Sequence, residues 1–212
     1  MKENSIRRAV REGRAALGTG LKEFASRGVP WIIEEAGFDY CAIDHEHGAF
    51  DTETIANLAS WFQATNVSAI VRIHKSFAHL IPGILDQGIM GIQVSEVETA
   101  QEACAIVRLA KYPPIGNRGI SGQGPHTGYK SYGARHATEY APWANENIII
   151  CPSIARRPGE CRGDRGGRRD RPSSRVPAGT RMISRSTVGT GAPHSVQNVR
   201  RYPGGVLTTG AS

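Results

Sequence analysis

The chain has 212 residues and a formal net charge of +7, but the charge is unevenly distributed. Residues 1–150 contain 14 basic and 16 acidic side chains, whereas residues 151–212 contain 12 arginines, no lysine and 3 acidic side chains. The last 62 residues also hold 10 of the 25 glycines and 6 of the 12 prolines. This distribution excludes a uniformly basic protein, and we expect no packed core in the tail.

Several protein classes are excluded at this stage. No apolar run approaches the roughly 18–20 residues that span a bilayer, and the charged start of the chain lacks the hydrophobic stretch of a secretory signal. The four cysteines lie far apart and form no CxxC pair, which argues against a disulfide framework or a zinc site. We therefore expect a cytoplasmic protein.

Apolar periodicity predicts alternating helices and strands along the first 151 residues. We expect helices over residues 5–14 (with Ser5 as N-cap), 22–27, 31–36, 52–63, 78–87 and 97–108. We expect strands over residues 16–19, 38–44, 68–73, 90–94 and 147–151, with a further short strand at 117–120. Alternation of this kind, with continuous apolar strands, predicts an α/β fold around a parallel sheet covered on both faces.

Polar side chains follow three neighbouring strands, where parallel α/β folds place their chemistry. They are Asp44, Glu46, His47, Arg72, His74, Gln93 and Ser95. Phosphate-binding glycine motifs are absent, because Gly122-Gln123-Gly124 lacks the further glycine at the required spacing and no GxxxxGK occurs. The strand ends are therefore the candidate site.

The densest of these clusters is Asp44-His45-Glu46-His47-Gly48. One interpretation is a general base accompanied by acidic groups, which either orient the base or contact a metal. The other is a polar turn in which the histidines have their hydrogen-bond partners within the protein. If the strand continued, Asp44 and Glu46 would face one side and His45 and His47 the other. The spacing is not the HExxH of a zinc protease, which makes a His/His zinc site improbable.

Arg72 and Asp86 are candidates of a different kind. Arg72 ends an apolar strand at the same edge, where it could hold a substrate carboxylate in bidentate fashion or form a structural salt bridge. Asp86 lies near a predicted helix C-terminus, which is unfavourable for an acid and indicates a partner such as a histidine.

Several of these fragments together resemble the HpcH/HpaI aldolase (citrate lyase-like) family. The resemblance covers about residues 4–151 and rests on residues 36–40 and 43–48, on Val71-Arg72, on Leu85-Asp86-Gln87-Gly88 and on residues 111–119, Lys-Tyr-Pro-Pro-Ile-Gly-Asn-Arg-Gly. It implies metal-dependent class II aldolases built on a (β/α)8 barrel of the TIM type. Such enzymes cleave 4-hydroxy-2-oxo acids, for example 4-hydroxy-2-oxoheptanedioate, to pyruvate and an aldehyde.

The resemblance also implies roles for individual residues. His47 is expected to be the catalytic base and Asp86 the aspartate that pairs with it. Arg72 is expected to hold the pyruvate carboxylate and keto oxygen and to steady the enolate, and Gln93 is a second candidate for substrate binding. These roles fit the chemistry, since enolisation needs a base, a charge sink and a carboxylate clamp.

The resemblance stops where the composition changes. The family's divalent metal (Mg, Mn or Co) is held by a Glu and by an Asp in a Gly-Pro-x-Asp-Leu motif; here Ala155 stands near the Glu position and the second motif is absent. We hypothesise a one-nucleotide frame change near codon 152, because codons permitted for residues 159–171, shifted by one base, can encode a segment that resembles the family's sequence at this point. We therefore predict no metal ligands in this chain.

The sequence thus predicts the first five to six strands of a TIM-type barrel in residues 1–151, followed by an irregular, non-homologous basic tail in residues 152–212. The predicted ancestral function is a metal-dependent aldolase, and this chain is expected to be impaired or inactive. Two alternatives remain: an Arg-rich tail that binds nucleic acid, or a non-catalytic subunit of an aldolase assembly. The resemblance implies a homo-oligomer, a hexamer in the family.

Overall fold

The computed structural model describes residues 2–153 together with two two-residue strands, β6 (Arg200–Arg201) and β7 (Leu207–Thr208), which pair in antiparallel fashion. Ala155 and nearly all of the predicted basic tail therefore lie outside the described residues. The predicted boundary between residues 151 and 152 falls one residue before the end of the last strand of the main sheet, which includes Pro152, and the division into two segments stays a prediction.

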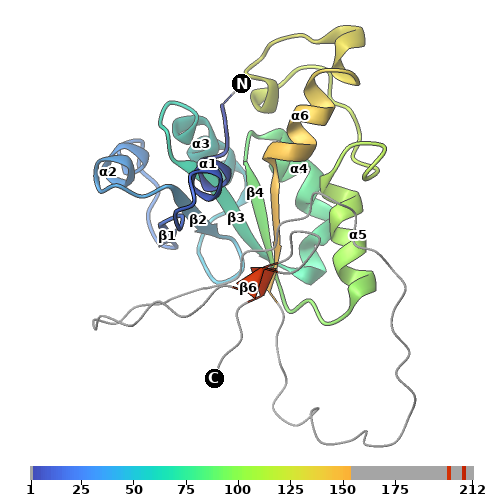
Figure 1. The fold of residues 1–212 in the computed structure, drawn as a ribbon. Coiled ribbons are helices and arrows are strands. Elements are labelled where there is room, and N and C mark those ends of the chain that lie inside the picture. Colours follow the sequence, from blue (N-terminus) through green and yellow to red (C-terminus); the bar gives the residue numbers. More distant parts are fainter. Residues whose placement is uncertain (1, 154–199, 202–206, 209–212) are drawn as a thin grey trace, which may run out of the picture.

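The main sheet has five parallel strands that pair in chain order (Figure 1). They are β1 (Gly18–Leu21), β2 (Tyr40–Asp44), β3 (Ser68–His74), β4 (Gly91–Ser95) and β5 (Ile149–Pro152). Neighbouring strands are joined through helical crossovers, as parallel strands require. This confirms the α/β class and is the arrangement expected for the first five strands of a (β/α)8 barrel.

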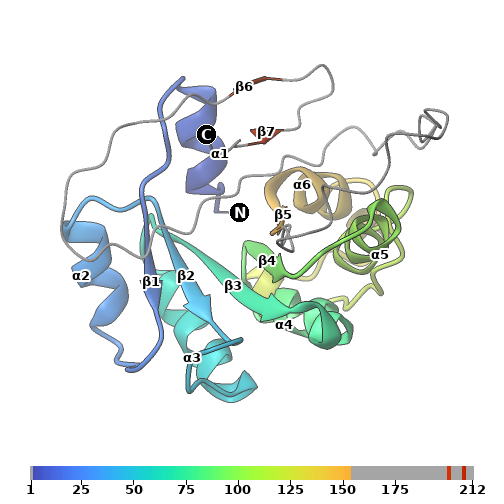
Figure 2. The same ribbon diagram turned by 90° about the horizontal axis from the view of Figure 1, so that it is seen from below.

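Four helices cover the outer side of the sheet. Figure 2 shows the strands in an arc, with α2 (Val29–Glu35), α3 (Thr52–Phe62), α4 (Ile81–Asp86) and α5 (Ala100–Ala110) along its outer side. Between these layers lies the main apolar core, to which the strands contribute Ile43, Val71, Ile73 and Ile92. No helix within residues 2–153 is long and apolar enough to cross a membrane.

The inner face of the sheet changes character along the strands. Near the amino ends it is apolar, because Ile70 and Ile149 pack against Ile6 of helix α1 (Ser5–Arg11). Near the carboxyl ends the same face carries polar side chains, since Asp44, Arg72 and Gln93 are register partners on adjacent strands. The fold thus closes one end of the inner face and leaves the polar end as the candidate site.

The structure corrects several predicted elements. Residues 22–27 do not form a helix; Lys22 instead follows β1, and its carbonyl accepts a hydrogen bond from the Ala49 N–H at 3.1 Å. Residues 117–120 form no strand. The first helix is capped by the side chain of Asn4 rather than Ser5, whose hydroxyl is buried and bonds to Ser68.

Other elements differ in extent. The predicted helix over 78–87 divides into the 3₁₀ helix η1 (Lys75–Leu80) and α4. Three elements before β5 were not predicted: η2 (Pro125–Thr127), η3 (Gly133–His136) and α6 (Tyr140–Asn147). The first helix is shorter than predicted, and α2 begins two residues earlier, with Pro30 in its first turn.

Candidate active site

The loop after β2 is a tight turn built on Asp44. The Oδ1 atom of Asp44 accepts hydrogen bonds from the backbone N–H groups of Glu46, at 3.1 Å, and His47, at 3.0 Å. A Cβ atom at Gly48 would lie 2.1 Å from the Asp44 carbonyl oxygen, so only glycine allows the chain to return this closely. The turn fixes the positions of Glu46 and His47 at the carboxyl edge of the sheet.

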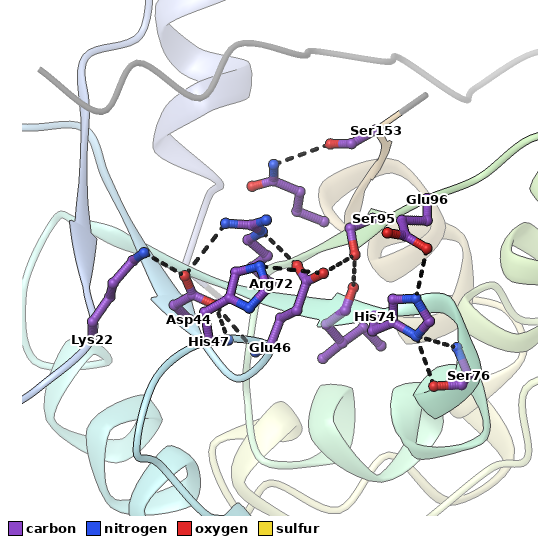
Figure 3. Close-up of polar contacts among 12 residues, drawn as sticks. Lys22, Asp44, Glu46, His47, Arg72, His74, Ser76, Ser95, Glu96 and Ser153 are labelled. Carbon is purple, nitrogen blue, oxygen red and sulfur yellow. Dashed lines mark hydrogen bonds and ion pairs between the residues drawn. The ribbon is translucent and has the colours of Figure 1, made fainter. Parts of the chain in front are cut away.

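Arg72 lies between the two carboxylates of this turn (Figure 3). Its Nη1 atom is 3.4 Å from Asp44 Oδ2, and its Nε atom is 2.8 Å from Glu46 Oε2. The contact with Glu46 is an ion pair, because its geometry does not meet the angular requirement of a hydrogen bond. Lys22 completes the group, with Nζ 3.3 Å from Asp44 Oδ2. Two cations and two carboxylates thus meet within one network.

The network sets the protonation of Asp44, whose side chain is 5% exposed. Burial by itself would raise the pKa of Asp44. The hydrogen bonds from the His47 and Glu46 N–H groups and the positive charges of Arg72 and Lys22 outweigh burial, so the pKa lies below its ordinary value. Asp44 is therefore a carboxylate at neutral pH.

The lowered pKa of Asp44 predicts an acid-dependent loss of stability. The unfolded chain takes up this proton more readily than the folded chain, so the contribution of Asp44 is present above its unfolded pKa, near 4, and is lost as the pH falls further. We expect Asp44→Asn to reduce the fall in the free energy of unfolding between about pH 5 and about pH 3. Urea denaturation at both pH values measures this.

Asp39, at the opposite edge of the sheet, serves as the comparison for Asp44. The Arg14 guanidinium donates a hydrogen bond to Asp39 and lowers the pKa of its carboxyl. Asp39 remains in the Asp44→Asn variant and sustains part of the acid dependence. An unchanged difference between pH 5 and pH 3 in Asp44→Asn would contradict the electrostatic account of the network.

The two histidines of the turn have different surroundings. His47 is 59% exposed, and its Nε2 atom lies 3.6 Å from Glu46 Oε1. His45 donates its backbone N–H to the Arg72 carbonyl, and its ring Nδ1 lies 2.7 Å from the Phe50 carbonyl oxygen. The strand does not continue beyond Asp44, so the alternation that would have placed Glu46 and His47 on opposite sides does not apply to this turn. Glu46 and His47 therefore lie together.

The polar ends of β4 and β5 complete this edge. Ser95 donates its hydroxyl to Glu46 Oε1 at 2.6 Å. Gln93, the register partner of Arg72, donates its amide N–H to Ser153 Oγ at 3.1 Å. The structure thus brings together the predicted residues Asp44, Glu46, His47, Arg72, Gln93 and Ser95, and the substrate-binding role of Gln93 stays a prediction.

Asp86 lies elsewhere. Helix α4 runs antiparallel to the strands, so its last residue lies near the amino edge of the sheet, whereas His47 follows the carboxyl end of β2. The Asp86 carboxylate pairs with Arg118 Nη2 at 2.5 Å, and the Arg118 guanidinium stacks 4.7 Å from the centre of the Tyr112 ring. Within one chain the expected pairing of Asp86 with His47 is not formed, and a role for Asp86 in catalysis stays a prediction.

Two further residues of the edge were missed by sequence reasoning. Lys22 falls in the predicted helix over 22–27, which does not form; it directly follows β1, which extends two residues beyond the predicted strand over 16–19. Ser153 follows the last strand in the same way, but residues after position 151 were assigned to the tail. In both cases an error in an element boundary removed a residue from the candidate site.

The residues at this edge do not fit a metal centre. Within residues 2–153 and the two short strands, no group of three or more His, Cys, Asp or Glu side chains is placed to hold a metal ion. The two carboxylates nearest the site, Asp44 and Glu46, already face Arg72 and Lys22. The position of the metal-binding Glu expected from the family resemblance, Ala155, lies outside the described residues.

Comparison with known proteins gives consistent matches. The HpcH/HpaI aldolase/citrate lyase family matches residues 30–155. A 4-hydroxy-2-oxovalerate aldolase of Novosphingobium aromaticivorans is 36% identical over 157 residues, which cover 71% of this chain and 55% of the relative. A hydroxypyruvate/pyruvate aldolase of Roseobacter denitrificans is 29% identical over 159 residues, covering 74% and 59%.

The same likeness is found among solved structures. An HpcH/HpaI aldolase from Desulfitobacterium hafniense DCB-2 superposes with a TM-score of 0.63 and 31% sequence identity, over 70% of this chain and 56% of that chain. The chain spans a little over half the length of the relatives that it matches. These comparisons favour the aldolase interpretation over the nucleic-acid-binding alternative.

Proposed function

Because the chain belongs to the HpcH/HpaI aldolase/citrate lyase family, we propose that the carboxyl edge of its sheet is the 2-oxo acid site of an aldolase. The reaction is the cleavage of a 4-hydroxy-2-oxo acid to pyruvate and an aldehyde, the class that the names of the relatives indicate. The observation that carries the proposal is Arg72, an arginine on the inner face of β3 held in place by Asp44 and Glu46.

Arg72 supplies the binding chemistry of this proposal. Asp44 and Glu46 engage its Nη1 and Nε atoms, and neither of these two carboxylates engages Nη2. The held guanidinium can therefore offer donors to a substrate carboxylate and 2-oxo oxygen without first being ordered, which lowers the entropic cost of binding. The same positive charge stabilises the enolate that forms as the bond between C3 and C4 breaks.

His47 supplies the proton transfer. It is exposed at the edge of the site, within reach of bound substrate, and Glu46 Oε1 lies 3.6 Å from its ring. In the cleavage direction the base takes the proton of the C4 hydroxyl, the C3–C4 bond breaks and its electrons pass to the pyruvate enolate. Gln93, next to Arg72, is placed to bind the pyruvate half.

The family's divalent metal has no complete ligand set among the described residues, and no step of this proposal is routed through it. A bound cation would add charge stabilisation to the enolate. We therefore infer that the 212-residue chain retains binding of the 2-oxo acid more fully than turnover.

Pyruvate binding tests this proposal directly. We expect the 212-residue chain to bind pyruvate at least about tenfold more tightly than acetate, because the planar 2-oxo acid engages the guanidinium through two oxygens rather than through a carboxylate alone. Isothermal titration, with histidine resonances followed by NMR, measures both ligands. Equal binding of pyruvate and acetate would refute a 2-oxo acid site.

A further inference from the structure

Glu46 and Arg72 face each other in an unusual orientation. Glu46 Oε2 lies 2.8 Å from Arg72 Nε, yet the two atoms do not form a hydrogen bond, and neither has a hydrogen-bond partner among the described residues although both atoms are buried. A carboxylate this close to a guanidinium normally aligns with the N–H groups, because hydrogen bonds between charged groups are about twice as strong as neutral ones. Another contact must therefore hold the Glu46 carboxylate in this orientation.

The hydroxyl of Ser95 binds the other oxygen of the same carboxylate. Ser95 is the last residue of β4 and is buried, and its Oγ donates to Glu46 Oε1 at 2.6 Å. The contact of the same hydroxyl with the Ile73 carbonyl oxygen is longer, at 3.4 Å. Because a hydroxyl has one proton to donate, that proton goes to Glu46. Figure 3 shows the Glu46 carboxylate between Arg72 and Ser95, so each of its oxygens faces a different partner.

The geometry of the guanidinium determines where the Glu46 carboxylate would go without this bond. The N–H groups of Nε and Nη2 lie parallel along one edge of a guanidinium, so a carboxylate that aligns with Nε also reaches Nη2. Glu46 Oε2 already lies beside Arg72 Nε. A rotation of the carboxylate would therefore give a bidentate ion pair, and Glu46 would then occupy Nη2, a donor that the proposed function leaves for the substrate.

We propose that Ser95 is a positioning residue of the 2-oxo acid site. Its hydroxyl binds Glu46 Oε1, keeps the carboxylate from rotating onto the edge of Arg72 formed by Nε and Nη2, and so leaves Nη2 for the oxygens of the substrate. The inference rests on the proposed function, because it takes Arg72 to be the group that binds the 2-oxo acid. Ser95 acts through Glu46 and contacts neither the substrate nor Arg72.

The same hydrogen bond also orients Glu46 toward the proposed base. Oε1, the oxygen that accepts from Ser95, is the one that lies 3.6 Å from His47 Nε2. The bidentate arrangement would move this oxygen from Ser95 toward Nη2 of Arg72. One serine hydroxyl thus maintains the position of the carboxylate with respect to both Arg72 and His47.

Ser95→Ala tests the inference in the 212-residue chain, with pyruvate as the ligand. We expect the Kd of pyruvate, measured by isothermal titration, to rise about fivefold or more, because Glu46 competes with the substrate for Arg72 once its hydrogen bond to Ser95 is lost. Ser95→Thr keeps the hydroxyl and should restore most of the affinity. Ser76→Ala is the matched control: it removes a hydroxyl that contacts His74 at the same edge, and it should leave the Kd unchanged.

A double-mutant cycle with Glu46→Gln separates positioning from packing. Glu46→Gln removes the carboxylate that would compete for Arg72, so adding Ser95→Ala in this background should change the Kd of pyruvate by less than about twofold. A loss of packing at Ser95 would instead weaken binding by a similar factor with and without Glu46→Gln. Urea denaturation establishes that each variant is folded under the conditions of the titration.

The outcomes separate the inference from the proposed function. If the unmodified chain binds pyruvate and folded Ser95→Ala binds it equally tightly or more tightly, the positioning role is overturned while the 2-oxo acid site stands. An equal loss of affinity with and without Glu46→Gln also overturns it. Should Ser95→Ala fail to fold, Ser95→Cys, whose thiol is a weak donor, takes its place with the same expectation. If the unmodified chain does not bind pyruvate, the 2-oxo acid site and the inference fail together.

Discussion

Arg72→Ala is expected to destabilise the folded chain by about 3 kcal/mol and to abolish pyruvate binding. The guanidinium faces Asp44, whose side chain is 5% exposed, and Glu46, whose side chain is 9% exposed. Removing it leaves two largely buried carboxylates, with Lys22 still beside Asp44, and uncompensated buried charge is a recognised cause of large destabilisation. Urea denaturation measures the first effect and titration with pyruvate the second.

Two variants separate these effects. Arg72→Lys keeps the positive charge but loses the planar fork, so we expect most of the stability to return and pyruvate binding to stay weak. Arg14→Ala removes an arginine that pairs with Asp39 through two nitrogens, at 2.6 and 2.7 Å, near the amino edge of the sheet. Pyruvate binding should survive in Arg14→Ala as long as the protein is folded. If Arg72→Ala bound pyruvate normally, the assignment of the 2-oxo acid site would be wrong.

The strands and their polar ends were predictable from the sequence because a physical regularity connects them. Buried parallel strands are continuous apolar runs, and parallel strands present their carboxyl ends at one edge. Asp44, Arg72 and Gln93 therefore had to meet once three such runs were recognised. Figure 1 shows that these strands lie next to one another in the sheet.

The errors arose where local pattern competes with tertiary contacts. Residues 22–27 carry charged and aromatic residues at helical spacing, but a six-residue segment is too short to be helical without packing, and Lys22 instead pairs with Asp44. The partner of Asp86, Arg118, is 32 residues away and is set by a loop rather than by a repeating pattern.

If the reading frame changes near codon 152, restoring it is expected to produce retro-aldol activity, which we do not expect from the 212-residue chain. Arg72 and His47 supply a clamp and a base, but the described residues provide no ligand set for the cation that the family uses. The restored segment would supply the Glu and Asp motifs that Ala155 and the following residues lack. Pyruvate release from a 4-hydroxy-2-oxo acid, followed by a coupled assay, should then appear and should be lost with a chelator.

In the restored protein, His47→Ala should lower kcat by about 10²–10⁴, the usual contribution of a positioned base. His45→Ala is the matched control, because that ring comes from the same turn but contacts the Phe50 carbonyl oxygen, and it should have a much smaller effect. Comparable losses in both variants would mean that the turn matters only for folding. Strong metal-dependent turnover by the 212-residue chain would contradict this prediction. It would mean that other groups bind the cation, and that the residue at position 155 and the missing Asp motif are dispensable for catalysis by Arg72 and His47.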